Sequence, residues 1–269
     1  KVQLNLKPCV SLEILKAYKS FILSHSSQDN KSFNLTTLEC GAHFDGEESH
    51  YFEQLNFDTW FMEATESTYE KLISNKNDRI LSYLNRHRTA IYTLHHDCLK
   101  KCIHGALSTK VGEQTFYQKP YYAGYNSLAR EEKHDHESRV MFKLAQGEGA
   151  IKDEEVLVKT YDYNYVISSI IKKRVNIFIL DIEGHEPELL KSMKDSVEES
   201  NLPEIIAIEC GWTWKERKKL LKEMNYNLDF YSHNNGVFSL NSREIKKEND
   251  SIEKINLENP KFEMPAGLG

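Results

Sequence analysis

The stretch that decides the fold is residues 178–186, which read Phe-Ile-Leu-Asp-Ile-Glu-Gly-His-Glu. An apolar run that stops abruptly at carboxylates and a glycine is typical of a buried parallel strand delivering polar groups to the carboxyl edge of a sheet. Residues 37–46, Thr-Leu-Glu-Cys-Gly-Ala-His-Phe-Asp-Gly, have the same design. Open α/β folds bind their ligands at this edge. We therefore expect the functional site where these two strands end.

Periodicity along the rest of the chain predicts an α/β fold. Strands are predicted at residues 35–40, 59–64, 102–107, 156–160, 175–180, 205–209, 228–231 and 236–240. Helices are predicted at residues 10–24, 47–55, 68–74, 164–172, 186–192 and 214–224. Alternating strands and helices form parallel sheets with right-handed crossovers, so we expect a mostly parallel sheet with residues 156–160 at its edge. Asn234-Asn235-Gly236 joins the last two strands and predicts a C-terminal antiparallel hairpin.

The same patterning divides the chain into three parts. Residues 1–34 are interpreted as an N-terminal helical extension, because apolar residues recur there at helical spacing. Residues 35–240 form one domain, within which residues 117–149 lose their periodicity and are interpreted as an insertion or lid. Residues 241–269 are charged and rich in asparagine, and we expect this tail to have little structure of its own.

Charge and composition narrow the function classes. The formal net charge of -6 and the pI near 6.0 disfavour a general binder of nucleic-acid phosphates. No apolar run approaches the ~20 residues needed to cross a bilayer, so no membrane span is expected. The odd count of 5 cysteines fits a reducing compartment and predicts a cytoplasmic location. Glycosylation-type sequons at Asn30 and Asn34 leave secretion as the alternative.

The first strand and its loop have the features of a nucleotide site. Gly41 lets a ligand approach the backbone between strand and helix. Glu63 closes the second strand 63 − 39 = 24 residues after Glu39, near the spacing at which an acid meets ribose hydroxyls in βαβ units. The alternative is a glycine turn beside a solvated glutamate. An acid at this place favours a ribose without a phosphate.

Five blocks of the sequence resemble, in order and spacing, the motifs of FkbM-type S-adenosylmethionine-dependent methyltransferases. They are Glu39-Cys40-Gly41-Ala42, Trp60-Phe61-Met62-Glu63-Ala64, Ala106-Leu107-Ser108 with Gly112, Thr160-Tyr161-Asp162 and Asp181-Ile182-Glu183-Gly184-His185-Glu186. The series covers about residues 35–240. The resemblance implies that this part is a methyltransferase domain with a Rossmann-like class I fold, in which helices cover both faces of a mostly parallel, seven-stranded sheet.

The resemblance also implies that S-adenosyl-L-methionine is the cofactor and which residues hold it. Glu63 would hold the ribose, the backbone of Gly41 and Ala42 the methionine portion, and residues 106–108 the adenine side. The implied cofactor-binding residues are Glu39, Gly41, Ala42, Phe44, Glu63, Ala106, Leu107, Ser108 and Asp181.

The acceptor side is expected at the second acidic turn. Asp181, Glu183, His185 and Glu186 fall within one strand-to-helix connection, and a hydroxyl acceptor needs a base because a neutral hydroxyl is a poor nucleophile. Glu183 and His185 are the candidate catalytic residues. The alternative is that the glutamates only satisfy backbone donors in the first turn of a helix and that His185 is a surface residue.

The rest of the sequence contains candidate residues for the acceptor and clusters of the types that bind metals. Candidates for a wall that stacks on a sugar or another ring are Tyr121, Tyr122, Tyr125 and Asn126, although tyrosines also pack loops onto cores. His134-Asp135-His136 and His95-His96-Asp97-Cys98 with Cys102 look metal-like, but neither has a complete ligand set at a recognised spacing. We therefore expect no metal at either cluster.

The leading functional prediction is O-methylation of a hydroxyl on a glycan, a sugar-containing molecule or a secondary metabolite. The expected partner is thus a small-molecule or glycan acceptor, with no nucleic acid. A nicotinamide-dependent oxidoreductase is disfavoured because the first loop is not Gly-x-Gly-x-x-Gly and no Tyr-x-x-x-Lys pair is evident. A catalytically silent methyltransferase-like module that serves as a binding or scaffold partner is the alternative, because binding a cofactor does not prove turnover.

Overall fold

The protein is described here by a computed structural model. It describes residues 14, 16–17, 35–43, 46, 49, 52, 57–74, 101–119, 126–129, 154–210, 213–231 and 235–241. The helices predicted at residues 10–24 and 47–55 fall mostly outside these residues, as does the C-terminal tail. Among the residues that the structure describes, no helix has both the length and the apolar character needed to cross a bilayer.

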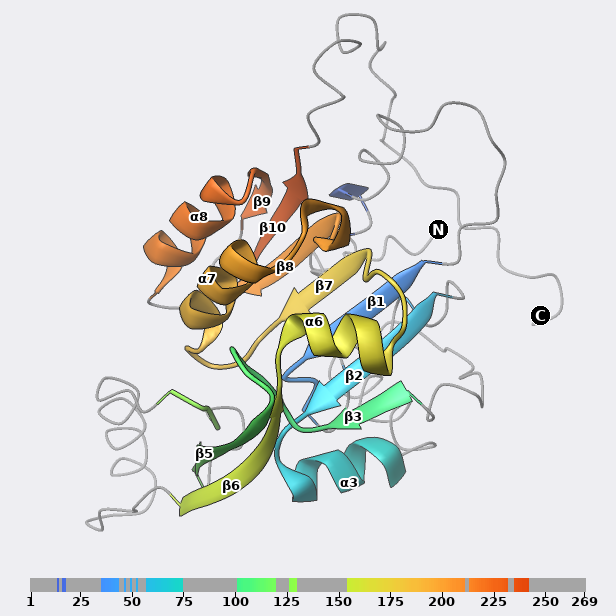
Figure 1. Cartoon of the computed structure of the whole chain (residues 1–269), viewed down its shortest axis with the longest axis vertical. Helices are drawn as coiled ribbons and strands as arrows, with labels where there is room; N and C mark the ends of the chain where they lie inside the picture. Colours follow the sequence, from blue (N-terminus) through green and yellow to red (C-terminus); the bar gives the residue numbers. More distant parts are fainter. Residues whose placement is uncertain are drawn as a thin grey trace, which may run out of the picture.

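The larger sheet has seven strands in the order β3-β2-β1-β7-β8-β10-β9 (Figure 1). Its strands are β1 Thr36–Cys40, β2 Asp58–Glu63, β3 Cys102–His104, β7 Ile177–Leu180, β8 Ile205–Glu209, β9 Tyr226–Tyr231 and β10 Asn235–Leu240. β3, β2, β1, β7 and β8 pair in parallel with one another, and β10 pairs antiparallel with both β8 and β9. The predicted mostly parallel, seven-stranded sheet is therefore confirmed, and its strand order reverses between β1 and β7.

Alternating side chains of the central strands build a core on each face of this sheet. Phe178 and Leu180 of β7 pack in the larger core, together with Ile206 and Ile208 of β8. Their neighbours Ile177 and Ile179 point to the opposite face, where they meet Ile205, Ala207, Ile14, Ala17 and Phe52. Because both faces are covered, these strands read as uninterrupted apolar runs.

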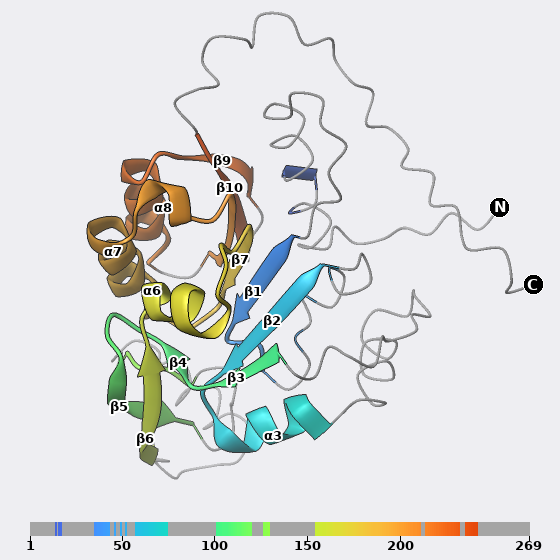
Figure 2. The ribbon, with the colours of Figure 1, turned by 45° about the vertical axis from the view of Figure 1, so that its right-hand side comes forward.

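Helices lie on both faces. The helices α6 Tyr163–Tyr165, α7 Glu186–Ser196 and α8 Trp214–Glu223 cover the face of the larger core (Figures 1 and 2). On the other face, Leu72 of α3 Glu66–Ser74 packs against Phe61 of β2. The predicted helix at 164–172 continues from α6 as a π-helix, Val166–Ile170, in which the Ile171 N–H bonds the Val166 carbonyl. A short 3₁₀ turn follows at Glu199–Asn201.

A second, three-stranded sheet lies beyond the carboxyl ends of β1, β2 and β7 (Figure 2). Its order is β4-β6-β5, with β4 Ala106–Leu107, β5 Gly112–Gln118 and β6 Glu154–Tyr161. Two predictions are wrong here: residues 102–107 form two strands in different sheets, and residues 156–160 belong to the middle strand of the second sheet.

Gly105 explains the first of these corrections. It has a φ of 149°, and a Cβ at this position would lie 2.6 Å from the ring of Tyr161 and 2.9 Å from the Lys159 carbonyl oxygen. The chain therefore turns at this glycine, leaves β3 and pairs β4 with β6. The partner strand lies some fifty residues further along the chain, so local periodicity contains no sign of the pairing.

Candidate functional site

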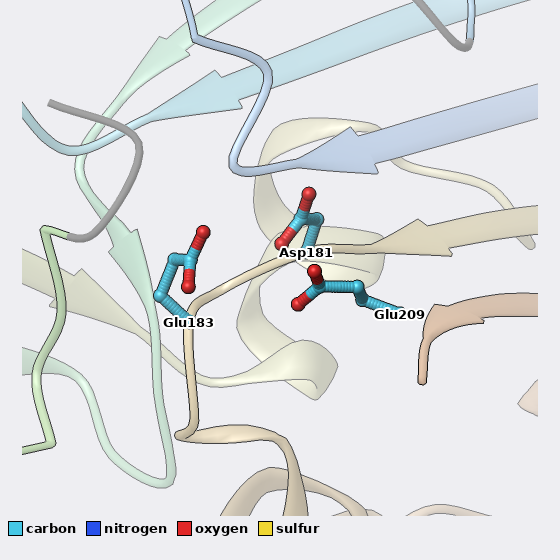
Figure 3. A group of neighbouring side chains, drawn as sticks. All are labelled: Asp181, Glu183 and Glu209. Carbon is cyan, nitrogen blue, oxygen red and sulfur yellow. The ribbon is translucent and has the colours of Figure 1, made fainter. Parts of the chain in front are cut away.

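Three carboxylates converge at the carboxyl edge of the larger sheet. Asp181 directly follows β7, Glu183 lies in the turn after it, and Glu209 ends β8. One carboxylate oxygen from each lies within 4.8 Å of the others, and Figure 3 shows the three groups turned toward a common point. Like charges this close do not all stay ionised unless they share a proton or a cation. The described part of the chain thus concentrates negative charge where β7 and β8 end.

This crowding changes the protonation of Glu183. Burial, together with the charges of Asp181, Glu209 and Glu186, raises the pKa of Glu183 to about 9, and Arg217 opposes the rise. At neutral pH Glu183 therefore carries a proton in the absence of a ligand. A cation bound beside it would release that proton, because an opposite charge favours the ionised carboxylate.

The turn that carries Glu183 has an uncommon backbone. Glu183 has a φ of 53°, and Gly184 has a φ of 100°. A left-handed conformation costs about 1–2 kcal/mol for a residue other than glycine, so the turn must be held from outside. Glu186, fully buried at the start of α7, accepts hydrogen bonds from the N–H groups of Ile182 at 3.1 Å and Gly184 at 2.9 Å. Glu186 thus has the backbone-satisfying role that the sequence left open.

Arg217 balances the charge of Glu186. The Arg217 side chain is 1% exposed, and its Nη2 lies 2.6 Å from Glu186 Oε2. Its Nη1 donates to the Glu209 backbone carbonyl at 2.5 Å. Removing one partner of such a buried pair strands a charge and typically costs about 3–5 kcal/mol. The pair therefore joins α8 to the start of α7 and to the end of β8.

His185 contacts the residues that follow β4. Its Nε2 lies 3.3 Å from Ser108 Oγ, and its Nδ1 lies 3.9 Å from Glu188 Oε2. Gln114 Nε2 donates to the same Ser108 hydroxyl at 2.7 Å. Burial lowers the pKa of His185, with Glu188 opposing, so the ring is neutral at neutral pH. Ser108 and His185, which the sequence assigned to the adenine side and the acceptor side, are therefore neighbours.

The turn after β1 is pressed against the turn after β7. Gly41 has a φ of 80°, and a Cβ there would lie 1.7 Å from the Asp181 carbonyl oxygen. The N–H groups of Gly41 and Ala42 both donate to the Met62 carbonyl, at 3.0 and 3.1 Å. The Asp181 N–H donates to the Cys40 carbonyl at 3.1 Å. Only glycine fits at position 41, because two backbones meet there.

The two acids predicted to bind cofactor near this turn accept hydrogen bonds from the backbone. Glu39 is 2% exposed, and its Oε2 accepts from the Ser49 N–H at 2.8 Å. Glu63 is 7% exposed and accepts from the N–H groups of His43 at 3.0 Å and Thr65 at 2.7 Å. Burial raises the pKa of Glu63, and these hydrogen bonds oppose the rise. Glu63 thereby ties the loop after β1 to the end of β2.

The described part of residues 117–149, the predicted insertion, reaches the same edge. Asn126 Nδ2 donates to Thr65 Oγ1 at 3.2 Å, and Ser127 Oγ donates to the Ile182 carbonyl at 3.3 Å. Residues 126–127 therefore lie beside the ends of β2 and β7. Phe44, Tyr121, Tyr122, Tyr125 and the histidine clusters at residues 95–98 and 134–136 fall outside the described residues.

The structure adds residues that the sequence analysis did not assign to the site. Glu209 joins Asp181 and Glu183, and the run of residues 205–209 that ends in an acid was a visible signal for it. Gln114 and Arg217 had no such signal, because both come from segments without a motif and contact the site across the fold. Ala106 and Leu107 are buried in β4.

Together the fold and site define a doubly wound α/β protein whose polar residues gather where the strand order reverses, the usual ligand site of such sheets. The family model of the Methyltransferase FkbM domain matches residues 39–236, which is well over half of the chain. The chain belongs to the FkbM methyltransferase family, as its motifs suggested, and family membership supports a methyltransferase role.

Two solved structures are similar to the chain. One is the methyltransferase FkbM from Methylobacillus flagellatus KT, with a TM-score of 0.41, 13% identity and coverage of 87% of this chain and 56% of that one. The other is a TehB-like SAM-dependent methyltransferase from Corynebacterium glutamicum, with a TM-score of 0.30, 7% identity and coverage of 87% of this chain and 100% of that one. The chain thus spans little more than half the length of the first protein. No curated protein gives a significant match.

Proposed function

We propose that the protein is an S-adenosylmethionine-dependent O-methyltransferase acting on a hydroxyl of a glycan, a sugar-containing molecule or a secondary metabolite. Membership of the FkbM family supports the methyltransferase part of the proposal. The observation that carries the rest is the convergence of Asp181, Glu183 and Glu209 beside the close backbone contact at Gly41. S-adenosylmethionine has a positively charged sulfonium, which suits an edge where carboxylates crowd together.

The residues at the ends of β1, β2 and β7 would hold the cofactor. The backbone of Gly41 and Ala42 is the proposed partner of the methionine portion, with Gly41 exposed and Ala42 buried beside it. Glu63 is the proposed partner of the ribose, and Asp181 is the proposed source of charge near the sulfonium. The other proposed cofactor residues are Glu39, Phe44, Ala106, Leu107 and Ser108. When bound, S-adenosylmethionine supplies an electrophilic methyl group, so the chain's own tasks are alignment and removal of the acceptor proton.

Glu183 and His185 are the proposed proton acceptors for the hydroxyl. The pKa of Glu183 is raised to about 9, so this carboxyl can accept a proton from the acceptor only after a neighbouring cation has lowered that pKa and released the proton it carries. His185 is neutral at neutral pH because burial lowers its pKa, so its ring can accept a proton. The insertion would cover the acceptor, since residues 126–127 bond to Thr65 and to the Ile182 carbonyl at the same edge.

One observation favours the alternative, a catalytically silent binding or scaffold module. The carboxylates of Glu39 and Glu63 already accept hydrogen bonds from the backbone, so both residues have a structural use without any cofactor. Each carboxylate oxygen has a second lone pair, however, and a ribose hydroxyl can donate to the Glu63 carboxylate without displacing those bonds.

Calorimetric titration of the protein with S-adenosylmethionine and with its demethylated product, S-adenosylhomocysteine, tests the proposal. Saturable binding of both is expected, and the absence of binding would exclude cofactor use. A screen of hydroxyl-bearing acceptors with S-adenosylmethionine carrying a radiolabelled methyl group then separates the two candidates. Transfer to a hydroxyl supports the enzyme, whereas binding without transfer to any acceptor supports the silent module.

A further inference from the structure

We propose that Arg217 is a positioning residue that acts through Glu186 to hold the acidic turn, residues 181–184, against the end of β8. The inference rests on the proposed function, because the turn carries the groups assigned there to the cofactor and the acceptor. Arg217 itself lies on α8, outside every motif that suggested the function. Its effect on the reaction would therefore be indirect.

The first step of the argument is that one side chain contacts two elements. Arg217 Nη2 lies 2.6 Å from Glu186 Oε2 at the start of α7, and Nη1 donates to the Glu209 carbonyl at the end of β8. A guanidinium is planar and presents its donors in a rigid fork. Making both contacts at once therefore fixes the distance between the start of α7 and the end of β8, and with it the place of the Glu209 side chain relative to the turn.

Glu186 transmits this constraint to the turn. Its Oε1 accepts from the Ile182 N–H and its Oε2 from the Gly184 N–H, so the carboxylate spans Glu183 on both sides. Without Arg217, the buried carboxylate would lose its counter-charge and take up a proton. A protonated carboxyl accepts hydrogen bonds more weakly, so the left-handed backbone at Glu183 would lose its restraint.

Packing alone does not account for an arginine at this place. Leu221 of the same helix is fully buried in the larger core and already anchors α8 to the sheet. A buried ion pair is often matched or surpassed in stability by well-packed apolar side chains. The pair has a use that apolar residues cannot supply, because the charge of Arg217 opposes the rise that burial causes in the pKa of Glu186 and so favours the ionised carboxylate.

Amide hydrogen exchange of the turn provides a test that needs no ligand. In Arg217→Met, exchange at Ile182 and Gly184 should be at least about tenfold faster than in the wild type, with Phe178 of β7 changed far less. Lys218→Met, an exposed charge-to-apolar change on the same helix, is the matched control and should leave all three amides unchanged. Equal acceleration at all three amides, or none at the turn, would show that Arg217 is only structural.

The double variant Glu186→Gln/Arg217→Met covers the case in which Arg217→Met does not fold, because it removes both charges of the pair. If it melts near the wild-type temperature, it should bind S-adenosylmethionine about tenfold or more weakly, while S-adenosylhomocysteine affinity changes by less than about threefold. General destabilisation would lower the affinity for both ligands by the same factor. Affinities equal to those of the wild type would overturn the inference. A wild-type protein that binds neither ligand would refute the proposed function, and exchange at Ile182 and Gly184 in the folded variant would still decide the role of Arg217.

Discussion

The turns after β1 and β7 begin from the same sequence design and use it in opposite ways. After β1, the acid Glu39 lies inside the strand and bonds to the Ser49 N–H, while Gly41 lets two backbones meet. After β7, the acids follow the strand and converge, and Gly184 only helps the chain to turn. A strand that ends in an acid and a glycine therefore marks the edge of the sheet, but the position of the acid relative to the strand end decides what it does.

The crowding of carboxylates at the turn after β7 should cause a loss of stability that depends on pH. Folded Glu183 keeps its proton to about pH 9, whereas the unfolded chain releases it near 4.5, so the folded state binds more protons between these values. The free energy of unfolding should therefore fall as the pH rises through this window, by several kcal/mol and at most about 6. Glu183→Gln keeps the side chain neutral and should remove the part of this fall that Glu183 contributes.

Denaturant unfolding at about pH 5 and pH 9, without any cationic ligand, measures the difference. Glu216→Gln, an exposed acid on α8, is the control and should follow the wild type at both values. Equal pH dependence of the unfolding free energy in Glu183→Gln and in the wild type would show that the pKa of Glu183 is not raised in the folded protein.

Turnover distinguishes the two turns. Substitutions in the acidic turn after β7 should lower turnover, whereas substitutions in the turn after β1, at Gly41, should not. Loss of the true base lowers turnover by about 10²–10⁴-fold with cofactor affinity nearly unchanged. If His185 is the base, activity should rise with pH to a plateau, with a midpoint below ~6.5 because burial lowers its pKa. His185→Ala should erase that rise. A His185→Ala protein with the wild-type rate and pH profile would leave Glu183, or alignment alone, as the explanation.

Substitution of Gly41, in the turn after β1, should destabilise the protein for steric reasons. In Gly41→Ala the new Cβ would meet the Asp181 carbonyl at 1.7 Å, at a φ of 80°. Strain and overpacking together should cost about 2–5 kcal/mol of unfolding free energy. Gly112→Ala is the matched control, since its φ is 150° but nothing lies within 4 Å of the added Cβ. Equal melting temperatures for the two variants would contradict the close backbone contact.

Glu63 should show the smallest of these functional effects, a loss of cofactor affinity. Glu63→Ala removes a charge-assisted hydrogen bond to the ribose worth ~1.5–3 kcal/mol and should weaken S-adenosylmethionine binding about tenfold or more. Glu66→Ala, a nearby exposed acid at the start of α3, should bind like the wild type. Unchanged affinity in a folded Glu63→Ala protein would show that Glu63 has only a structural role, through its hydrogen bonds from the N–H groups of His43 and Thr65.

Much of the main sheet could be predicted because buried parallel strands leave a plain signal. β7 and β8 are short apolar runs that stop at an acid, and β1 and β2 are more mixed strands that carry an acid at or near their end. All four appear within a few residues of the predicted ranges. The second sheet could not be predicted in the same way. Ala106 pairs with Thr160, so the pairing depends on contacts between residues distant in sequence and on one glycine that turns the chain.

The site was predictable where its residues follow strands and unpredictable where they reach it from elsewhere. Asp181 and Glu183 come directly after β7, so sequence order alone placed them at the edge. The contact between Ser108 and His185 depends on the second sheet folding back over that edge. The ion pair of Arg217 with Glu186 joins two helices. Helical periodicity predicts burial for apolar residues, so it did not predict that this arginine is buried.

The position of β10 has a consequence for synthesis of the chain on the ribosome. Among the strands that the structure describes, β10 is made last, yet it lies between β8 and β9 and pairs with both. Until residue 240 has left the exit tunnel, β8 presents an unpaired edge of apolar residues, and such edges template aggregation. Folding of this sheet is therefore completed late, and a chain truncated before Asn235 would keep exposed the edge of β8 with which β10 pairs.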